Sequence, residues 1–214
     1  MKTLMYSLVV ILIISTNYVI ASDISYDRIT NKSIGVNVKH VFFYDDSLNK
    51  YGADSNFDID SAMPVGINTN YFFNKNISIE LSIDFLLIHN VNWTINGSDL
   101  LTDLLKINTN PINLTARYHF QFNKILYPYV GLGCSYNFNE IDSRLYEIDD
   151  SIGYNINIGS ELICFNPRIA FVIEIKYFNL DAELTLSRPF AGFRPKYEVK
   201  LHGLSSSMGF NFYF

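Results

Sequence analysis

A strict alternation of apolar and polar residues restricts the fold of this chain more than any other feature of its sequence. Residues 77–85 read I-S-I-E-L-S-I-D-F, so odd positions are apolar and even positions are serine, glutamate or aspartate. Successive side chains of a β-strand point to opposite faces, whereas a helix would mix the two sets. The segment therefore predicts a strand with one apolar face and one polar face.

The same alternation recurs along the chain and predicts eight strands, near residues 33–44, 62–73, 77–85, 111–122, 127–138, 151–163, 168–180 and 197–214. Short connections at 74–76, 123–126 and 165–167 alternate with long polar ones at 45–61, 90–110, 139–150 and 181–196. In the last strand the alternation slips at His202–Gly203, which predicts a β-bulge. This pattern predicts an all-β fold, an eight-stranded antiparallel up-and-down transmembrane β-barrel with short periplasmic turns and long extracellular loops.

The placement of charge distinguishes a membrane barrel from a soluble one. Seven charged residues within the predicted strands share the polar face: Lys39, Glu80, Asp84, Arg117, Glu161, Glu174 and Lys176. A soluble barrel would carry its charges outside, but a lipid-facing Lys or Arg at the bilayer midplane costs about 2–4 kcal/mol. Aromatic residues such as Tyr44, Phe73, Tyr118 and Phe138 lie near strand ends, where interfacial girdles belong. The apolar face is therefore expected to contact outer-membrane lipids.

The two ends of the sequence carry signals for export and assembly. Residues 1–21 combine a basic start, an apolar stretch too short to span a bilayer and a small residue, Ala21, which predicts a cleaved signal peptide before a barrel domain of residues 22–214. The chain ends with apolar residues at alternate positions, Met208, Phe210, Phe212 and Phe214. This ending resembles the signal read by the outer-membrane assembly machinery, which makes that machinery an expected partner. The predicted location is the outer membrane of a Gram-negative bacterium.

The polar face supplies the candidate functional residues, because it would line the lumen. The predicted lumen-lining set is Lys39, Glu80, Ser82, Asp84, Arg117, His119, Glu161, Glu174 and Lys176. Charges in a narrow lumen should pair, because an unpaired buried charge is costly. The structural interpretation is a salt-bridge network that plugs the barrel. The functional one is a polar or gated path past Lys176 and Arg117.

The second long loop contains a separate apolar cluster, Trp93, Leu100, Leu101, Leu104 and Leu105. Such a cluster could cap the barrel mouth or recruit an apolar solute. A short helix packed on the rim is the favoured interpretation.

Several classes of function are not expected. The formal net charge of −5 and the absence of a basic run argue against nucleic-acid binding. No paired metal-ligand spacing is present, and no metal or cofactor is predicted. The four histidines are isolated and no G-x-S-x-G occurs, so an enzyme is not predicted. The sequence leaves the oligomeric state open.

From about Met63 to Phe214 the chain resembles the outer membrane protein W (OmpW) family. The resemblance is carried by N-I-S-I-E-L at 76–81, N-P-I-N-L-T-A-R-Y-H-F at 110–120, Y-P-Y-V-G-L-G at 127–133, D-D-S-I-G at 149–153, K-Y-F-N-L-D at 176–181 and the ending G-F-N-F-Y-F. It implies a narrow eight-stranded barrel that passes small hydrophobic molecules, and some members serve as bacteriocin or phage receptors or as surface antigens. Two departures stand out: Ser82 and Lys176 replace bulky apolar residues of the lumen, and Gly203 replaces a proline.

Two functions follow as expectations. The first is a passive channel for small hydrophobic molecules. The alternative is a closed structural or surface-recognition barrel, such as an adhesin, antigen, bacteriocin receptor or phage receptor, with a salt-bridged lumen.

Overall fold

The computed structural model describes residues 31–44, 46–47, 55–59, 61–85, 87–95, 98–122, 125–141, 146–163, 166–186 and 196–214. The predicted signal peptide lies outside these residues, so its cleavage stays a prediction. No helix long and apolar enough to cross a membrane occurs in the described part of the chain.

The described residues form antiparallel β-strands. In chain order they are β1 (Lys32–Phe43), β2 (Asp46–Ser47), β3 (Ser55–Ile59), β4 (Val65–Phe72), β5 (Ile77–Phe85), β6 (Leu87–Ile95), β7 (Ser98–His119), β8 (Leu126–Ile141), β9 (Tyr146–Ile148), β10 (Ser151–Ile163), β11 (Ile169–Leu186) and β12 (Lys196–Tyr213). Eight of them, β1, β4, β5, β7, β8, β10, β11 and β12, build the barrel wall, as the sequence predicted.

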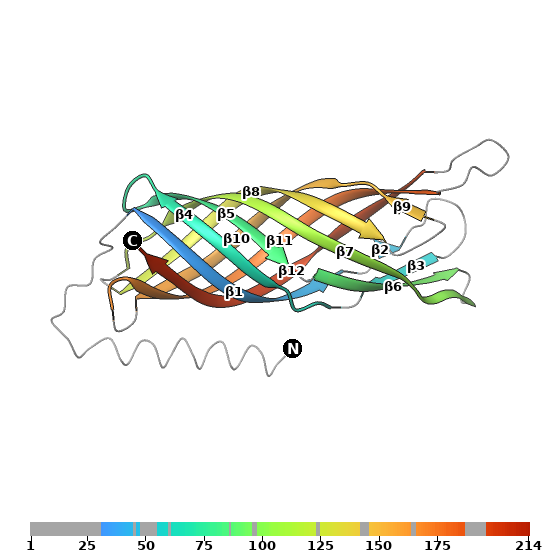
Figure 1. Ribbon diagram of the computed structural model, residues 1–214, viewed down its shortest axis with the longest axis horizontal. Coiled ribbons are helices and arrows are strands. Elements are labelled where there is room, and N and C mark those ends of the chain that lie inside the picture. The colour runs from blue at the N-terminus through green and yellow to red at the C-terminus, as the bar shows by residue number, and fades with distance from the viewer. Residues whose placement is uncertain are drawn as a thin grey trace.

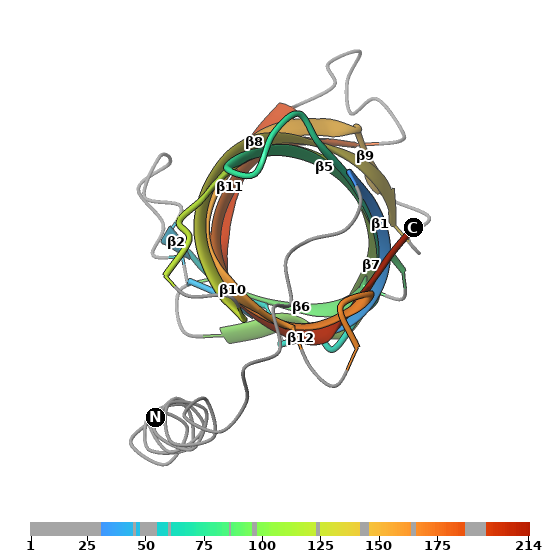
Figure 2. The same cartoon turned by 90° about the vertical axis from the view of Figure 1, so that its left-hand side faces the viewer.

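The barrel closes where the first strand meets the last. β1 pairs with β12 in one antiparallel register, from Ser33 opposite Tyr213 to Phe43 opposite Gly203. The wall then runs from β1 through β4, β5, β7, β8, β10 and β11 back to β12 (Figures 1 and 2). Closure pairs the backbone along the seam, which a sheet in lipid requires because no water is present to satisfy a free edge.

The outer surface has the expected lipid-facing character. On β4 buried and exposed residues alternate without interruption from Val65 to Phe72. Mid-strand apolar side chains stand outside, with Leu132 63% exposed and Ile158 60% exposed. Aromatic pairs occupy both ends of this apolar band: Tyr71 with Phe73 near the short turns, and Tyr136 with Phe138 toward the long connections. The strand alternation thus produces a lipid-facing band with interfacial aromatic residues.

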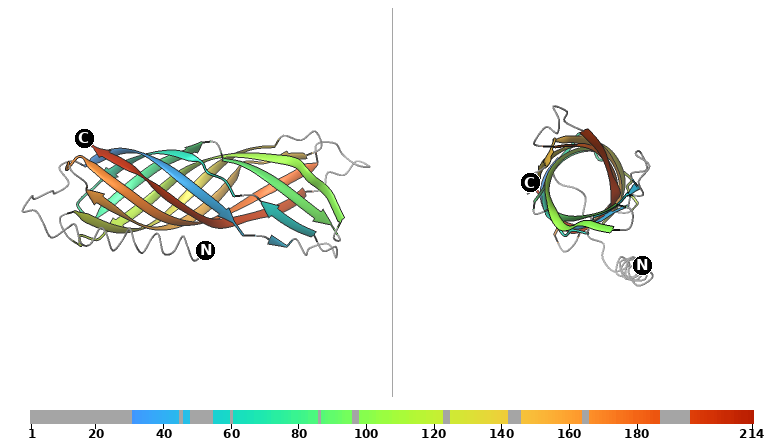
Figure 3. Two further views of the ribbon diagram at one scale, coloured as in Figure 1. Left: turned by 90° about the horizontal axis from the view of Figure 1, so that it is seen from below. Right: turned by 90° about the vertical axis from the view of Figure 1, so that its right-hand side faces the viewer.

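The wall continues past the apolar band at the end opposite the C-terminus (Figures 1 and 3). β7 has 22 residues, whereas a tilted strand needs about 9–11 to cross the hydrocarbon region. The alternation inverts in this extension: Leu180 and Ala182 are buried, while Glu140 and Asp181 are exposed. Above the membrane, the barrel therefore resembles a water-soluble barrel, with apolar residues inside and charged residues outside.

Two expectations drawn from the alternation were wrong. No bulge occurs at His202–Gly203, because β12 keeps one register with β11 from Thr185 opposite Lys196 to Ile169 opposite Phe212. The apparent slip arises because the strand enters the extension, where apolar residues turn inward. A Cβ on Gly203 would collide with the carbonyl oxygen of Phe42 and would lie 2.9 Å from Phe178 Cζ, so glycine makes room for the neighbouring backbone and for the aromatic ring.

The expected loop at 90–110 is also a strand hairpin. Trp93 lies on β6, and Leu100, Leu101, Leu104 and Leu105 lie on β7, with Trp93 paired to Leu101. The prediction of a short helix on the rim is therefore wrong. The side chains of this cluster lie outside the described part of the chain. Residues 98–110 continue a strand already paired inside the membrane, so local leucine content did not decide their conformation.

A charge placed on the lipid-facing surface should test the membrane assignment. Replacing Leu132 with arginine is expected to lower the free energy of unfolding in lipid vesicles by about 2–4 kcal/mol, because the guanidinium would face hydrocarbon. The measurement is urea denaturation, followed by the mobility of the unheated protein on a gel. Glu140→Arg is the matched control on the same strand, since Glu140 is exposed above the apolar band. Equal stability of the two variants would contradict the assignment.

Candidate functional site

The lumen is closed at the short-turn end by an apolar plug. Phe72, Tyr127, Ile163, Ala170 and Tyr213 form one buried cluster there, none of them more than 4% exposed. These side chains come from β4, β8, β10, β11 and β12, so the plug joins opposite parts of the wall. The plug therefore packs side chains from five strands against one another at the short-turn end.

A belt of charged side chains fills the lumen above the plug. Arg117 on β7 lies between two acids: its Nη1 is 2.5 Å from Glu80 Oε2, and its Nη2 is 2.5 Å from Glu174 Oε2. Its guanidinium also lies over the ring of Tyr129, 4.5 Å from the centroid. All of these side chains are at least nine-tenths buried. Arg117 therefore connects β5 to β11 across the interior.

Hydrogen bonds complete the coordination of the belt carboxylates. Tyr129 Oη and Asn157 Nδ2 each donate to Glu174 Oε2 at 2.9 Å. Asn68 Nδ2 donates to Glu80 Oε2 at 2.9 Å, and Tyr213 Oη donates to Glu161 Oε2 at 2.7 Å. Buried charges persist in proteins when their lone pairs and protons are satisfied in this way.

The two lysines of the belt have different surroundings. Lys39 Nζ lies 2.5 Å from Asp84 Oδ1 and forms a compact ion pair. Lys176 Nζ lies 3.7 Å from Glu174 Oε1, beyond hydrogen-bond distance, and the other oxygen of that carboxylate is already used by Arg117, Tyr129 and Asn157. Lys176 is thus the more weakly paired of the two.

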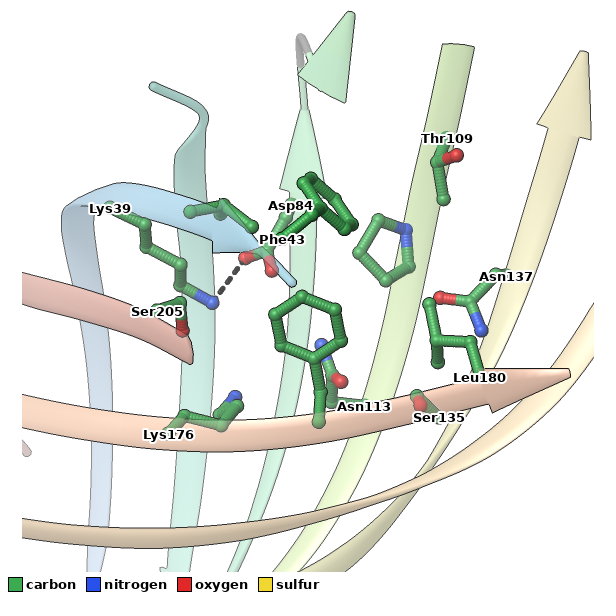
Figure 4. Close-up of a pocket in the computed structure, with 13 residues that line it drawn as sticks. Lys39, Phe43, Asp84, Thr109, Asn113, Ser135, Asn137, Lys176, Leu180 and Ser205 are labelled. Carbon is green, nitrogen blue, oxygen red and sulfur yellow. Dashed lines mark hydrogen bonds and ion pairs between the residues drawn. The ribbon is translucent and has the colours of Figure 1, made fainter. Parts of the chain in front are cut away.

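A pocket opens above the belt, toward the long connections. Its upper wall is apolar and includes Val41, Phe43, Pro111, Phe178 and Leu180. The rings of Phe43 and Phe178 meet edge to face, with centroids 5.4 Å apart. Lys39, Asp84 and Lys176 bound the pocket, together with the polar residues Thr109, Asn113, Ser135, Asn137 and Ser205 (Figure 4). We call this pocket the vestibule; its cavity volume is about 50 Å³.

The structure places every residue of the predicted lumen-lining set inside the barrel. Exposure is at most 6% for Lys39, Glu80, Ser82, Asp84, Arg117, His119, Glu161, Glu174 and Lys176. The terminal residues Met208, Phe210, Phe212 and Phe214 all face outward. The vestibule wall was not predicted from the sequence. Phe178 and Leu180 occupy the next alternate positions after Glu174 and Lys176 on the same strand, so they also face the lumen. Continuing the alternation along this strand would have identified them.

Sequence reasoning also missed a contact between Ser78 and His119. Ser78 Oγ lies 2.8 Å from His119 Nε2, the reach that a nucleophile and its base require. Both side chains are 1% exposed, and the His119 ring lies 5.2 Å from the rings of both Phe72 and Tyr129. The pair is packed into the plug, where it acts as a buried hydrogen bond. In the described residues no group of three or more His, Cys, Asp or Glu side chains could hold a metal ion.

Removing the central cation should show how far the belt depends on it. Arg117→Met leaves Glu80 and Glu174 without their shared partner, which is expected to lower the free energy of unfolding by about 3–5 kcal/mol. The double variant R117M/E80Q removes one charge of each sign and leaves Glu174 beside Lys176, so it should recover most of that loss. Urea denaturation in vesicles measures both. A double variant as unstable as the single one would show that packing of Arg117, and not charge pairing, is what matters.

Comparison with known proteins assigns this architecture to a family. The OmpW family profile matches residues 37–214. The comparison with curated protein sequences found no match. Among solved structures, the outer membrane protein OprG from Pseudomonas aeruginosa superposes with a TM-score of 0.72 at 21% identity, covering 89% of this chain and 98% of OprG.

Two further solved structures share the fold. The outer membrane protein AlkL, solved in lipid bilayers, gives a TM-score of 0.64 at 18% identity and covers 91% of this chain and 94% of AlkL. The Escherichia coli outer membrane protein W gives 0.60 at 17% identity, covering 86% and 98%. These neighbours show the barrel fold, and the profile shows the family. This chain belongs to the OmpW family of bacterial outer-membrane β-barrels.

Proposed function

We propose that this barrel admits small apolar molecules from outside the cell and assists their passage across the outer membrane. The observation that carries the proposal is the apolar wall of the vestibule, built by Val41, Phe43, Pro111, Phe178 and Leu180 above the charged belt. Ligand pockets are mostly apolar concavities with a few polar groups, and the lining of the vestibule has that composition. Family membership supports the same function.

The closed belt and plug limit what can move along the axis. Ions would have to pass Arg117 and its two carboxylates and then the buried cluster of Phe72, Tyr127 and Tyr213. The proposal therefore predicts very low ion conductance in a planar bilayer, together with measurable uptake of apolar solutes. An open pore with large, steady conductance would contradict this closed arrangement.

The alternative function is a closed surface-recognition barrel. It is favoured by the filled lumen and by the wall that extends beyond the apolar band on β7, β11 and β12. In that case the vestibule would be only the upper part of a structural core. The two functions differ in one result, because a closed recognition barrel leaves solute uptake unchanged.

Uptake of a fluorescent apolar probe separates the two. Gram-negative cells that make the protein should take up N-phenylnaphthylamine faster than cells that lack it. Phe178→Asn places an amide in the vestibule wall and should slow the added uptake roughly tenfold, since an unpaired buried amide costs about 1–3 kcal/mol. Fluorescence rise after probe addition gives the rate.

Phe138→Asn is the matched control, because Phe138 is an aromatic residue on the outer surface and 44% exposed. It should leave the added uptake unchanged when equal amounts of folded protein are present. Equal uptake with and without the wild-type protein would overturn the proposed function and favour the recognition barrel.

The proposed location in the outer membrane requires that the chain is exported. We expect removal of residues 1–21, so the mature protein in the outer membrane should begin at Ser22. Intact-mass measurement of the purified protein tests this directly. A mass that includes residues 1–21 would contradict the cleavage.

A further inference from the structure

We infer that the vestibule selects amphiphilic monocarboxylates, with the carboxylate held by Lys176 and the apolar tail held by the upper wall. The inference rests on the proposed function, because it takes the vestibule to be a solute site, and it adds the chemical class of the solute. It goes beyond an apolar conduit, since it assigns a specific anchoring cation at the base of the pocket.

Among the charged residues that line the vestibule, Lys176 is the one without a close partner. Its ionisable lining residues are Lys39, Asp84 and Lys176. Lys39 and Asp84 neutralise each other through a 2.5 Å contact. The ammonium of Lys176 has only a 3.7 Å contact with Glu174 Oε1. A ligand carboxylate at this point would supply the close partner that the protein does not.

A second polar group on the same pocket lacks a partner. Ser135 is 4% exposed, and its Oγ makes no hydrogen bond with any described residue. A hydroxyl can donate to a carboxylate oxygen, and a buried hydroxyl without a partner is costly. Figure 4 shows Lys176, Asn113 and Ser135 along the lower edge of the pocket, with Phe43 and Leu180 above them. A ligand that reaches Ser135 would therefore gain a hydrogen bond from its hydroxyl.

The upper wall fixes the rest of the ligand. Val41, Phe43, Pro111, Phe178 and Leu180 present no polar side-chain group to the pocket, so the part of the ligand that contacts them should be apolar. A small hydrophilic anion would leave this surface unfilled, and an alkane would leave Lys176 without a partner. A carboxylate with an alkyl or aryl tail matches both ends of the vestibule.

Equilibrium binding of octanoate and octanol to the full mature chain in lipid nanodiscs tests the inference. The two probes have the same tail, and only octanoate carries a charge. Lys176→Met should weaken octanoate binding about tenfold, because it removes a charged hydrogen-bond partner. It should change octanol binding less than about twofold, since methionine keeps a similar length. Binding to empty nanodiscs is subtracted for each probe.

Two further variants serve as controls. Lys176→Arg retains the positive charge and should keep most of the octanoate affinity. Lys75→Met removes a lysine from the exposed turn between β4 and β5, at the far end of the barrel, and should change neither probe. Mobility on an unheated gel shows that each variant is folded.

The outcomes separate this inference from the proposed function. Selective loss of octanoate in Lys176→Met, with rescue by arginine, supports the inference. Octanol binding with no advantage for octanoate, or equal loss of both probes in folded Lys176→Met, overturns the carboxylate site and leaves the proposed function standing. Failure of the wild-type protein to bind either probe overturns both, because the vestibule would then not be a solute site.

Discussion

A sheet that spans a membrane must leave no free edge, and this constraint governs the rest of the structure. The pairing of β1 with β12 closes the sheet into a cylinder, so backbone groups of the first and last strands satisfy each other. Closure also divides every strand into residues that face lipid and residues that face a narrow lumen. Because neighbouring side chains point in opposite directions, the chain must alternate apolar and polar residues wherever lipid surrounds it.

The narrow lumen then determines the internal chemistry. An eight-stranded barrel is just wide enough to be filled by side chains, so charges from opposite walls come into contact. Arg117 on β7 contacts Glu80 on β5 and Glu174 on β11, and Tyr129 supports the arrangement from β8. Below this belt lies the apolar plug, and above it the wall becomes apolar. The result is a barrel with three distinct layers rather than a uniform polar channel.

The vestibule exists because the environment of the strands changes along their length. Within the bilayer, apolar residues such as Leu132 face out and Lys176 faces in. Beyond it, Asp181 faces water while Leu180 turns inward. An apolar pocket therefore lies directly above charged groups, and the boundary between them contains Lys176, the cation with the weakest pairing. The proposed selection of amphiphilic carboxylates follows from that boundary.

Alternation alone determined the fold, the lipid-facing surface and which charged residues lie inside, because strand parity is a local property that the sequence displays directly. It failed at His202–Gly203 and at 90–110, where the strands leave the bilayer and one face no longer has to be apolar. Partners across the lumen were not predictable. Arg117 and Glu174 are 57 residues apart, and their contact depends on the register of every intervening strand and on the width of the closed barrel. The tertiary structure alone decided that Arg117 takes both acids, that Lys39 takes Asp84, and that Lys176 is left beside an apolar vestibule.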